Sequence, residues 1–219
     1  MIKAVIFDMD GLLIDSEPFW QPAQVTAFKT VGIELTQADL HSHMGRRIGE
    51  NIDHQYHKHP WEGPSRKDIE AMIVDQVIAS VKREGKLRPG ARKALDLCRG
   101  ESLPMAIASS SSAEIIDTVL NTLDIRSYFK LVYSADNETH GKPHPGVFVT
   151  TAELLGVPTQ ACLVFEDSPS GVLAAKAAKM ICVAVPEPGV KNNPFIRTAD
   201  LVIDSLEEFN AAMLGKLAN

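Results

Sequence analysis

The sequence lacks several features, and each absence narrows the class of protein. No apolar run reaches the roughly 18 residues that a membrane span needs, so we expect no membrane partner. The first residues, MIKAVIFDMDGLL, have neither the length nor the cleavage pattern of a signal peptide. A net charge of -6 leaves no basic surplus, which argues against a general nucleic-acid binder. An anionic ligand would therefore need a local cation.

Cysteine is also scarce, and its placement predicts a compartment. The three cysteines are Cys98, Cys162 and Cys182, and each stands alone among apolar residues. An odd, scattered set in apolar surroundings is typical of reduced core thiols and not of a disulfide framework. The sequence therefore predicts a cytoplasmic protein.

Short apolar runs alternate with helical patterns along most of the 219 residues. Continuous apolar runs suit parallel strands covered on both faces, and repeated strand–helix–strand units predict a doubly wound, Rossmann-like α/β sheet. The expected strands are residues 3–8, 103–108, 131–133, 162–165 and 181–185. The expected helices between them lie near residues 89–100, 112–123, 145–155 and 169–180.

One interval, residues 17–84, interrupts this alternation. It shows helical periodicity without a buried strand: Val25, Phe28 and Val31 share one predicted face. A second predicted face holds Ile69, Met72, Ile73, Val77 and Val81. We therefore predict an all-helical cap domain over residues 17–84, inserted into a core of residues 1–16 and 85–219. The chain returns to the core near Gly85–Gly90, where glycine and proline permit a hinge.

Two acids follow the first predicted strand directly, in Asp8-Met9-Asp10-Gly11. Ligands of doubly wound sheets bind beyond the carboxyl ends of the strands. Neighbouring carboxylates there repel each other unless a cation or a proton lies between them, and Mg²⁺ with its oxygen ligands satisfies this need. The tetrapeptide alone is equally compatible with a solvated surface turn, so later segments must decide.

The second strand leads into a row of hydroxyls that begins with Ser109 and Ser110. Ser111 and Glu114 have the spacing of a capping box, which by itself explains the segment as a capped helix. Hydroxyls and free backbone amides at a helix start are also typical of a phosphate site. In that interpretation Ser109 supplies its hydroxyl and Ser110 its N–H.

A lysine and two more acids follow later strands. Lys142 lies in the rigid segment GKPHP before a helix, where it is either a surface charge or a cation held for phosphate. Glu166 and Asp167 end an apolar strand, and Ser168 and Pro169 after them are a helix cap and first turn. Capping does not explain two adjacent acids, whereas a metal site does. Taken together, the residues that follow these predicted strands indicate one site for phosphate and a cation.

With these motifs the sequence resembles the haloacid dehalogenase superfamily. The matching segments are DMDGLLIDSE from Asp8, IASSSS with Ser109, GKPHP with Lys142, and FEDSPSG with Glu166-Asp167. The resemblance spans essentially the whole chain and favours the sugar-phosphate phosphatases with a helical cap, for which a monomer is the default expectation. The stretches DSEPFW and PWEGPSR are similar to bacterial 2-deoxyglucose-6-phosphatases and hexitol phosphatases. The resemblance implies a Mg²⁺-dependent phosphatase that hydrolyses small phosphate monoesters, namely hexose or hexitol phosphates.

The resemblance also implies a role for each site residue. Asp8 is the expected nucleophile that becomes a phosphoryl-aspartate, and Asp10 is the expected acid and base. Phosphoryl oxygens are expected to contact Ser109, Ser110 and Lys142. The implied Mg²⁺ ligands are Asp8, the backbone carbonyl of Asp10, Asp167 and, directly or through water, Glu166.

Three alternative activities are weighed against hydrolysis. The dehalogenases need no metal, so the acids Asp10, Glu166 and Asp167 argue against that chemistry. A β-phosphoglucomutase-like mutase is similar, but its cap histidine is replaced here by the segment EPFW, residues 17–20. A phospho-receiver signalling domain uses comparable residues but carries no helical cap.

The predicted cap holds the residues expected to contact the alcohol part of the substrate. These are Gly45-Arg46-Arg47, Glu17 and Trp20, although a solvated helix face is the ordinary position for one of the arginines. The cap also contains five of the seven histidines: His41, His43, His54, His57 and His59. A zinc site is conceivable from the spacing of His54 and His57, but the polar surroundings favour solvated histidines.

Overall fold

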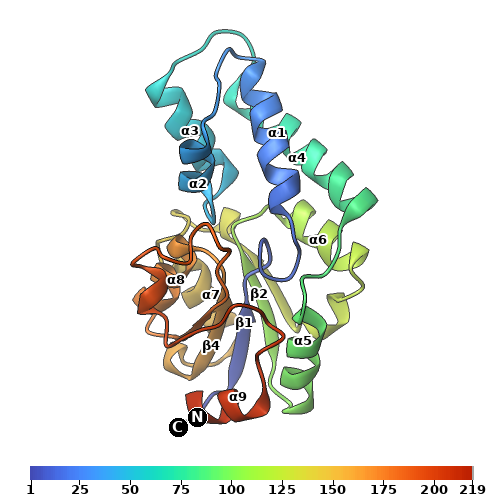
Figure 1. Cartoon of the computed structure of the whole chain (residues 1–219), viewed down its shortest axis with the longest axis vertical. Helices are drawn as coiled ribbons and strands as arrows, with labels where there is room; N and C mark the ends of the chain where they lie inside the picture. Colours follow the sequence, from blue (N-terminus) through green and yellow to red (C-terminus); the bar gives the residue numbers. More distant parts are fainter. Residues whose placement is uncertain (219) are drawn as a thin grey trace.

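A parallel sheet is the centre of the molecule in the computed structural model, which describes residues 1–218 (Figure 1). Within these residues the sheet has six strands in the order β3-β2-β1-β4-β5-β6. All neighbouring strands run parallel, which confirms the predicted doubly wound α/β fold. The strands are β1 Ala4–Phe7, β2 Met105–Ser109, β3 Leu131–Ser134, β4 Cys162–Glu166, β5 Ile181–Ala184 and β6 Leu201–Val202.

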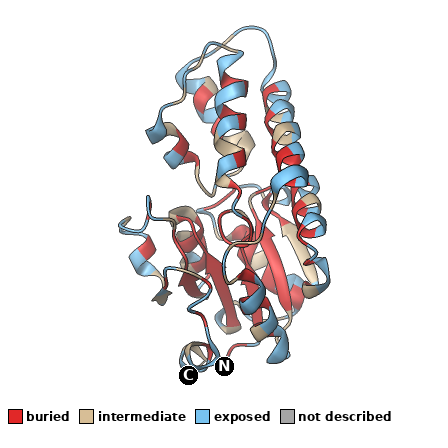
Figure 2. Ribbon diagram, turned by 45° about the vertical axis from the view of Figure 1, so that its right-hand side comes forward, coloured by how far each residue is buried: buried red, intermediate tan, exposed pale blue. Residues whose placement is uncertain are grey.

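The side chains of β1 are all buried because helices cover both faces of the sheet (Figure 2). Val5 and Phe7 pack into one apolar cluster, with side chains of α5, α6 and α9. Ala4 and Ile6, which alternate with them, pack into the other, with side chains of α7 and α8. The bounds are α5 Ala91–Gly100, α6 Ala113–Thr122, α7 Gly146–Leu155, α8 Pro169–Ala177 and α9 Ala211–Leu217.

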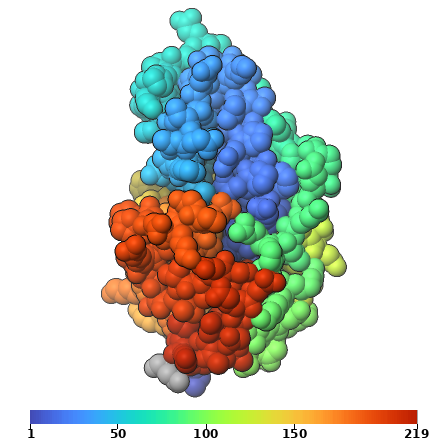
Figure 3. Space-filling model, viewed as in Figure 1, coloured from blue at the N-terminus to red at the C-terminus, as the bar shows by residue number. Residues whose placement is uncertain are grey.

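Four helices occupy residues 17–84, which we call the cap, and lie over the carboxyl ends of the strands (Figure 1). They are α1 Glu17–Lys29, α2 Gln37–His43, α3 Ile48–Lys58 and α4 Arg66–Glu84. Capping boxes start two of them, Thr36 with Asp39 in α2 and Ser65 with Asp68 in α4. In the space-filling view the cap rests directly on the core (Figure 3).

The two connections between core and cap run side by side. Ile14 on the outgoing segment forms a bridge with Leu87 on the returning one. The backbone N–H of Arg88 donates to the Leu13 carbonyl at 2.9 Å. The division of the chain into two domains at these connections stays a prediction.

The predicted apolar faces of the cap are partly wrong. Val25 is 39% exposed and Met72 is 40% exposed. Met72 is not among the buried residues of α4, which are Ile69, Ile73, Val77, Ile78, Ser80 and Val81. The sequence pattern correctly predicted helices but assigned Val25 and Met72 to their buried faces.

Candidate active site

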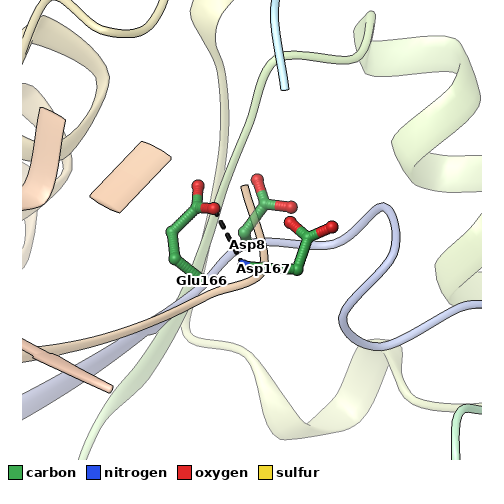
Figure 4. A group of neighbouring side chains, drawn as sticks. All are labelled: Asp8, Glu166 and Asp167. Atoms are coloured by element: carbon green, nitrogen blue, oxygen red, sulfur yellow. Dashed lines mark hydrogen bonds between the residues drawn. The ribbon is translucent and has the colours of Figure 1, made fainter. Parts of the chain in front are cut away.

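Three carboxylates meet at the carboxyl ends of β1 and β4 (Figure 4). Asp8 follows β1 directly, and its N–H donates to the Phe165 carbonyl of the neighbouring strand at 3.0 Å. Glu166 ends β4 and Asp167 follows it. One carboxylate oxygen of each acid lies within 4.8 Å of the others, and all three residues are buried. The parallel pairing of β1 with β4 therefore brings together acids that are far apart in the sequence.

Lys142 is the cation inside this cluster. Its Nζ donates to Asp8 Oδ1 at 2.5 Å, to Glu166 Oε1 at 2.6 Å and to the Ala108 carbonyl at 3.3 Å. Burial acts to lower the pKa of Lys142, but the carboxylates of Asp8 and Glu166 outweigh it and raise this pKa overall. The lysine is only 2% exposed, so it remains a fixed positive charge beside Asp8.

Glu166 differs from the other two acids because both of its oxygens already have partners. Oε1 accepts from Lys142. Oε2 accepts from the backbone N–H groups of Asp167 and Ser168 and from Ser168 Oγ, each at 3.0 Å. This carboxylate orients the lysine and the turn into α8. Asp8 and Asp167 are consequently the acids with oxygens available to a cation.

The electrostatics of Asp8 and Asp167 reflect a surplus of buried negative charge. Burial raises the pKa of Asp8 to about 7, with Lys142 opposing the rise and Glu166 adding to it. Burial also raises the pKa of Asp167 well above its ordinary value, and the nearby carboxylates of Glu166 and Asp8 add to this rise. The three buried carboxylates can carry more negative charge than the one lysine neutralises. A hard divalent cation with oxygen ligands fits this donor set.

Asp10 is turned toward the cap, away from this cluster. Its Oδ1 accepts from Ser16 Oγ and from the indole N–H of Trp20, both at 2.8 Å. Its Oδ2 accepts from Ser111 Oγ at 2.7 Å. The intervening Gly11 has φ +71°, and a Cβ there would lie 2.1 Å from Asp167 Oδ2. Only glycine at this turn lets the β1 loop and Asp167 approach so closely.

The serines after β2 have separate contacts. Ser109 is 1% exposed, and its Oγ accepts from the N–H of Ser111 at 3.0 Å. Ser110 Oγ donates to the Gly45 carbonyl of the cap at 2.9 Å. The capping box predicted for Ser111 is wrong, because Ser112 is the N-cap of α6 and Ser111 is directed to Asp10. Ser110 thus contacts the cap, Ser111 contacts the carboxylate of Asp10, and Ser112 caps α6.

One cavity, partly open to solvent, joins the core residues to the cap. The core contributes Asp8, Asp10, Ser109, Ser110, Ser111 and Asp167. The cap contributes Glu17, Trp20, Gln24, Leu40, His43, Met44, Gly45, Arg46, Ile48 and Asn51. The predicted cap contacts Glu17, Trp20 and Arg46 therefore do line the space next to Asp8. Burial raises the pKa of Glu17 there, although a hydrogen bond from Gln21 opposes the rise.

Arg47 is placed differently from its neighbour Arg46. Its guanidinium donates to the carbonyls of Ala135 at 3.2 Å, Glu138 at 2.9 Å and Thr139 at 3.3 Å in the core. It also pairs with Glu50, which accepts from the N–H of Gly141 at 2.9 Å. Arg47 therefore joins the cap to the loop that precedes Lys142 and does not line the cavity.

The interpretation of the cap histidines as solvated is wrong for His43. This residue is 3% exposed, with Nδ1 3.0 Å from Gln24 Oε1 and Nε2 3.2 Å from Gln55 Nε2. Burial lowers the pKa of His43 to about 4, so the ring is neutral. Sequence reasoning also missed Gln24, Asn51 and the role of Ser111. Gln24 and Asn51 are isolated polar residues in helices, Ser111 is one of four consecutive serines, and no spacing pattern distinguishes any of the three.

Comparison with known proteins agrees with this geometry. The family model of the haloacid dehalogenase-like hydrolases matches residues 5–185. The chain belongs to this family. It is 38% identical to hexitol phosphatase B of Escherichia coli (strain K12) over 211 residues, covering 96% of this chain and 95% of the relative. It is 34% identical to the phosphorylated carbohydrates phosphatase of Thermotoga maritima over 181 residues, covering 81% and 82%.

A solved relative shares the whole architecture of this haloacid dehalogenase-like hydrolase. The β-phosphoglucomutase of Clostridium difficile superposes with a TM-score of 0.88 at 25% identity, covering 100% of this chain and 98% of that one. The match extends over core and cap together. Among residues 1–218, no helix is both long and apolar enough to cross a membrane.

Proposed function

We propose that the chain is a Mg²⁺-dependent phosphatase that hydrolyses hexose or hexitol phosphates, such as 2-deoxyglucose 6-phosphate, through a phosphoryl-aspartate on Asp8. The observation that carries the proposal is the buried contact of Lys142 Nζ with Asp8 Oδ1 at 2.5 Å, at the inner end of the cavity. The 38% identity with a hexitol phosphatase supports this substrate class.

The proposed reaction has two steps. Asp8 forms a bond to phosphorus while the ester P–O bond breaks, and Asp10 gives a proton to the leaving alcohol oxygen. A water molecule then loses a proton to Asp10 and attacks phosphorus, which releases orthophosphate and restores Asp8. Both carboxylates line the same cavity, as this exchange requires. Ser109, Ser110 and Lys142 hold the phosphoryl oxygens.

The buried carboxylates of Asp8 and Asp167 fit Mg²⁺, and Glu166 supports them through Lys142 and the β4–α8 turn. The backbone carbonyl of Asp10 is the further proposed ligand. When bound, Mg²⁺ supplies positive charge that screens Asp8 from the phosphate dianion.

A β-phosphoglucomutase-like mutase is the second candidate, because a β-phosphoglucomutase has the same architecture. Trp20 argues for hydrolysis. Its indole N–H donates to Asp10, and an indole nitrogen is a donor only, so it cannot exchange protons as a cap histidine can. The two activities differ in product, which is free orthophosphate for a phosphatase and an isomerised sugar phosphate for a mutase.

A panel of phosphorylated metabolites, assayed for orthophosphate with Mg²⁺ and with excess EDTA, tests the proposal. We expect release from hexose and hexitol phosphates, loss of release in EDTA and recovery with Mg²⁺. Asp8→Asn is expected to lower kcat by at least about 1,000-fold, because an amide cannot attack phosphorus. The exposed Asp117 of α6 provides the matched control, Asp117→Asn. Normal turnover by Asp8→Asn, or by enzyme in EDTA, would refute the proposal.

A further inference from the structure

The cap end of the cavity is lined by uncharged polar side chains as well as by Glu17 and Arg46. Gln24, His43 and Asn51 are respectively 6%, 3% and 3% exposed. Buried amides and a neutral imidazole in one wall are unusual, because a buried polar group is costly unless it has a hydrogen-bond partner. The opposite end of the same cavity holds the acids and serines of the core. The cavity is therefore suited to a molecule with one charged end and one neutral, polar end.

The hydrogen bonds of His43 determine which atom of Gln24 remains available. Gln55 Nε2 faces His43 Nε2 at 3.2 Å, and an amide nitrogen only donates, so Nε2 of the neutral ring accepts. His43 Nδ1 then carries the proton and donates to Gln24 Oε1 at 3.0 Å. The Nε2 group of Gln24 has only a long contact of 3.5 Å to the Trp20 carbonyl. Gln24 consequently presents a donor to the cavity that it lines.

Asn51 supplies the complementary acceptor. Its Nδ2 donates to the His43 carbonyl at 3.2 Å. Its Oδ1 is the one buried side-chain nitrogen or oxygen in residues 1–218 that has no hydrogen-bond partner. An unpaired buried acceptor destabilises a protein, and a hydroxyl that donated to it would remove this cost. Trp20, Leu40 and Ile48 line the same cavity and offer apolar surface to the carbon chain of a polyol.

We infer that Gln24 and Asn51 form a hydroxyl-binding subsite, oriented by His43, that selects phosphate esters of polyhydroxylated alcohols over esters of plain alcohols. The inference rests on the proposed phosphatase activity and adds the residues that recognise the alcohol. Gln24 donates to one substrate hydroxyl oxygen, and Asn51 accepts from a hydroxyl proton. A site built for such hydrogen bonds discriminates strongly against an analogue that lacks the hydroxyls, because its polar groups are then left unpaired.

The test compares sorbitol 6-phosphate with n-hexyl phosphate, which has the same number of carbon atoms and no hydroxyls. We expect wild-type kcat/KM to be higher for the hexitol ester. Gln24→Leu and Asn51→Leu are expected to lower kcat/KM for sorbitol 6-phosphate by roughly 10- to 100-fold and for n-hexyl phosphate by less than about threefold. The exposed Gln37 of α2 supplies the control, Gln37→Leu, for which neither value should change.

The outcomes separate this inference from the proposed function. If the wild-type enzyme releases phosphate neither from these esters nor from any metabolite of the panel, the phosphatase proposal fails. If it hydrolyses both and the Leu variants lose activity on both equally, the subsite is overturned while the phosphatase stands. Thermal unfolding of each variant shows whether it is folded, and Gln24→Met and Asn51→Ser replace any variant that is not. Selective loss in a folded variant supports the subsite.

Discussion

At the scale of single residues, Lys142 makes contact with both Asp8 and Glu166, and these two acids have different tasks. Asp8 keeps oxygen atoms toward the cavity, whereas Glu166 is fully enclosed and holds the lysine from behind. A buried ion pair is stable only when further hydrogen bonds satisfy its remaining atoms. The donors from the start of α8 supply these bonds to Glu166.

Glu166→Gln tests this division of tasks. The amide removes the negative charge beside Lys142 and directs an NH₂ group either at the lysine or at the donors of the α8 turn. Because Lys142 keeps Asp8 as a partner, the main cost is the unpaired buried donors, and we expect the free energy of unfolding to fall by about 1–3 kcal/mol and kcat to fall as well. Urea unfolding measures the change, with the exposed Glu153→Gln of α7 as control. Equal stability of the two variants would contradict the assignment.

The core half of the site was accessible to sequence reasoning. Asp8, Ser109 and Glu166 stand at the ends of apolar strands, and parallel strands end at one edge of the sheet. Nothing in the sequence indicated that Asp10 turns to Ser111 and Trp20. The contact with Trp20 depends on how the cap rests on the core, and the contact with Ser111 depends on how the loops after β1 and β2 meet, and neither leaves a periodic signal.

At the scale of elements, α2 and α3 meet α1 through polar side chains. His43 ends α2, Gln24 lies on α1 and Gln55 lies on α3. The ring hydrogen bonds bind the three helices to one another. Since one ring nitrogen must accept, protonation of His43 breaks one of these bonds.

The pH dependence of stability follows from this histidine. Its pKa is lowered by burial from 6.5 to about 4, so between these values the unfolded chain binds a proton that the folded chain does not. Stability therefore rises with pH through this window and falls as the solution is acidified below the unfolded pKa. Between about pH 7 and about pH 5 the loss is about 2 kcal/mol. Nearby Asp39 opposes the shift, and Arg46 and Lys58 add to it.

Urea unfolding of wild type and His43→Gln at the two pH values measures this contribution. The carboxylates titrate in both proteins, so the difference between the two pH profiles isolates the ring. We expect acidification between the two pH values to lower the free energy of unfolding by about 2 kcal/mol less in the variant than in the wild type. Identical profiles would show that His43 is not a neutral, buried group.

The strands and helices of the core were predicted to within a few residues, and Ser168 and Pro169 do start α8. The elements that were missed are β6, which has two residues, and α9, which has seven. Segments this short hold one strand period or fewer than two helical turns, which is too little for a hydrophobic pattern to be recognised. Their structure depends on the packing of Phe209 and Leu214 into the core.

At the scale of the whole molecule, the cap contacts the core at points that surround the cavity. Ser110 binds the Gly45 carbonyl, Ser170 binds the Met44 carbonyl at 3.2 Å, and Arg47 binds the loop before Lys142. Gly45 has φ +74°, and a Cβ there would lie 2.3 Å from Ser168 Oγ. The connection between α2 and α3 thus supplies polar contacts of the cap with the core, while α4 packs against α6.

Arg47→Ala is expected to lower kcat/KM for hexitol phosphates by roughly 10-fold, because hydrogen bonds from a charged group to core carbonyls are lost. The effect should appear mainly in KM, since no atom of Arg47 lines the cavity. Steady-state assays measure it. Arg66, which pairs with Asp53 inside the cap, gives the control Arg66→Ala. A similar loss in both variants would mean that cap stability, and not its contact with the core, is responsible.

The pairing of β1 with β4 has a consequence for biosynthesis. Ala4 lies opposite Cys162, so β1, which directly precedes Asp8, leaves the ribosome long before β4 exists. At about 5–20 residues per second this delay is on the order of 10 s. Both backbone edges of β1 stay unpaired until β2 has been made, and one edge stays unpaired until β4 follows, which is a hazard for aggregation. Asp8 and Asp167 therefore cannot meet until β4 and the residue after it have been translated.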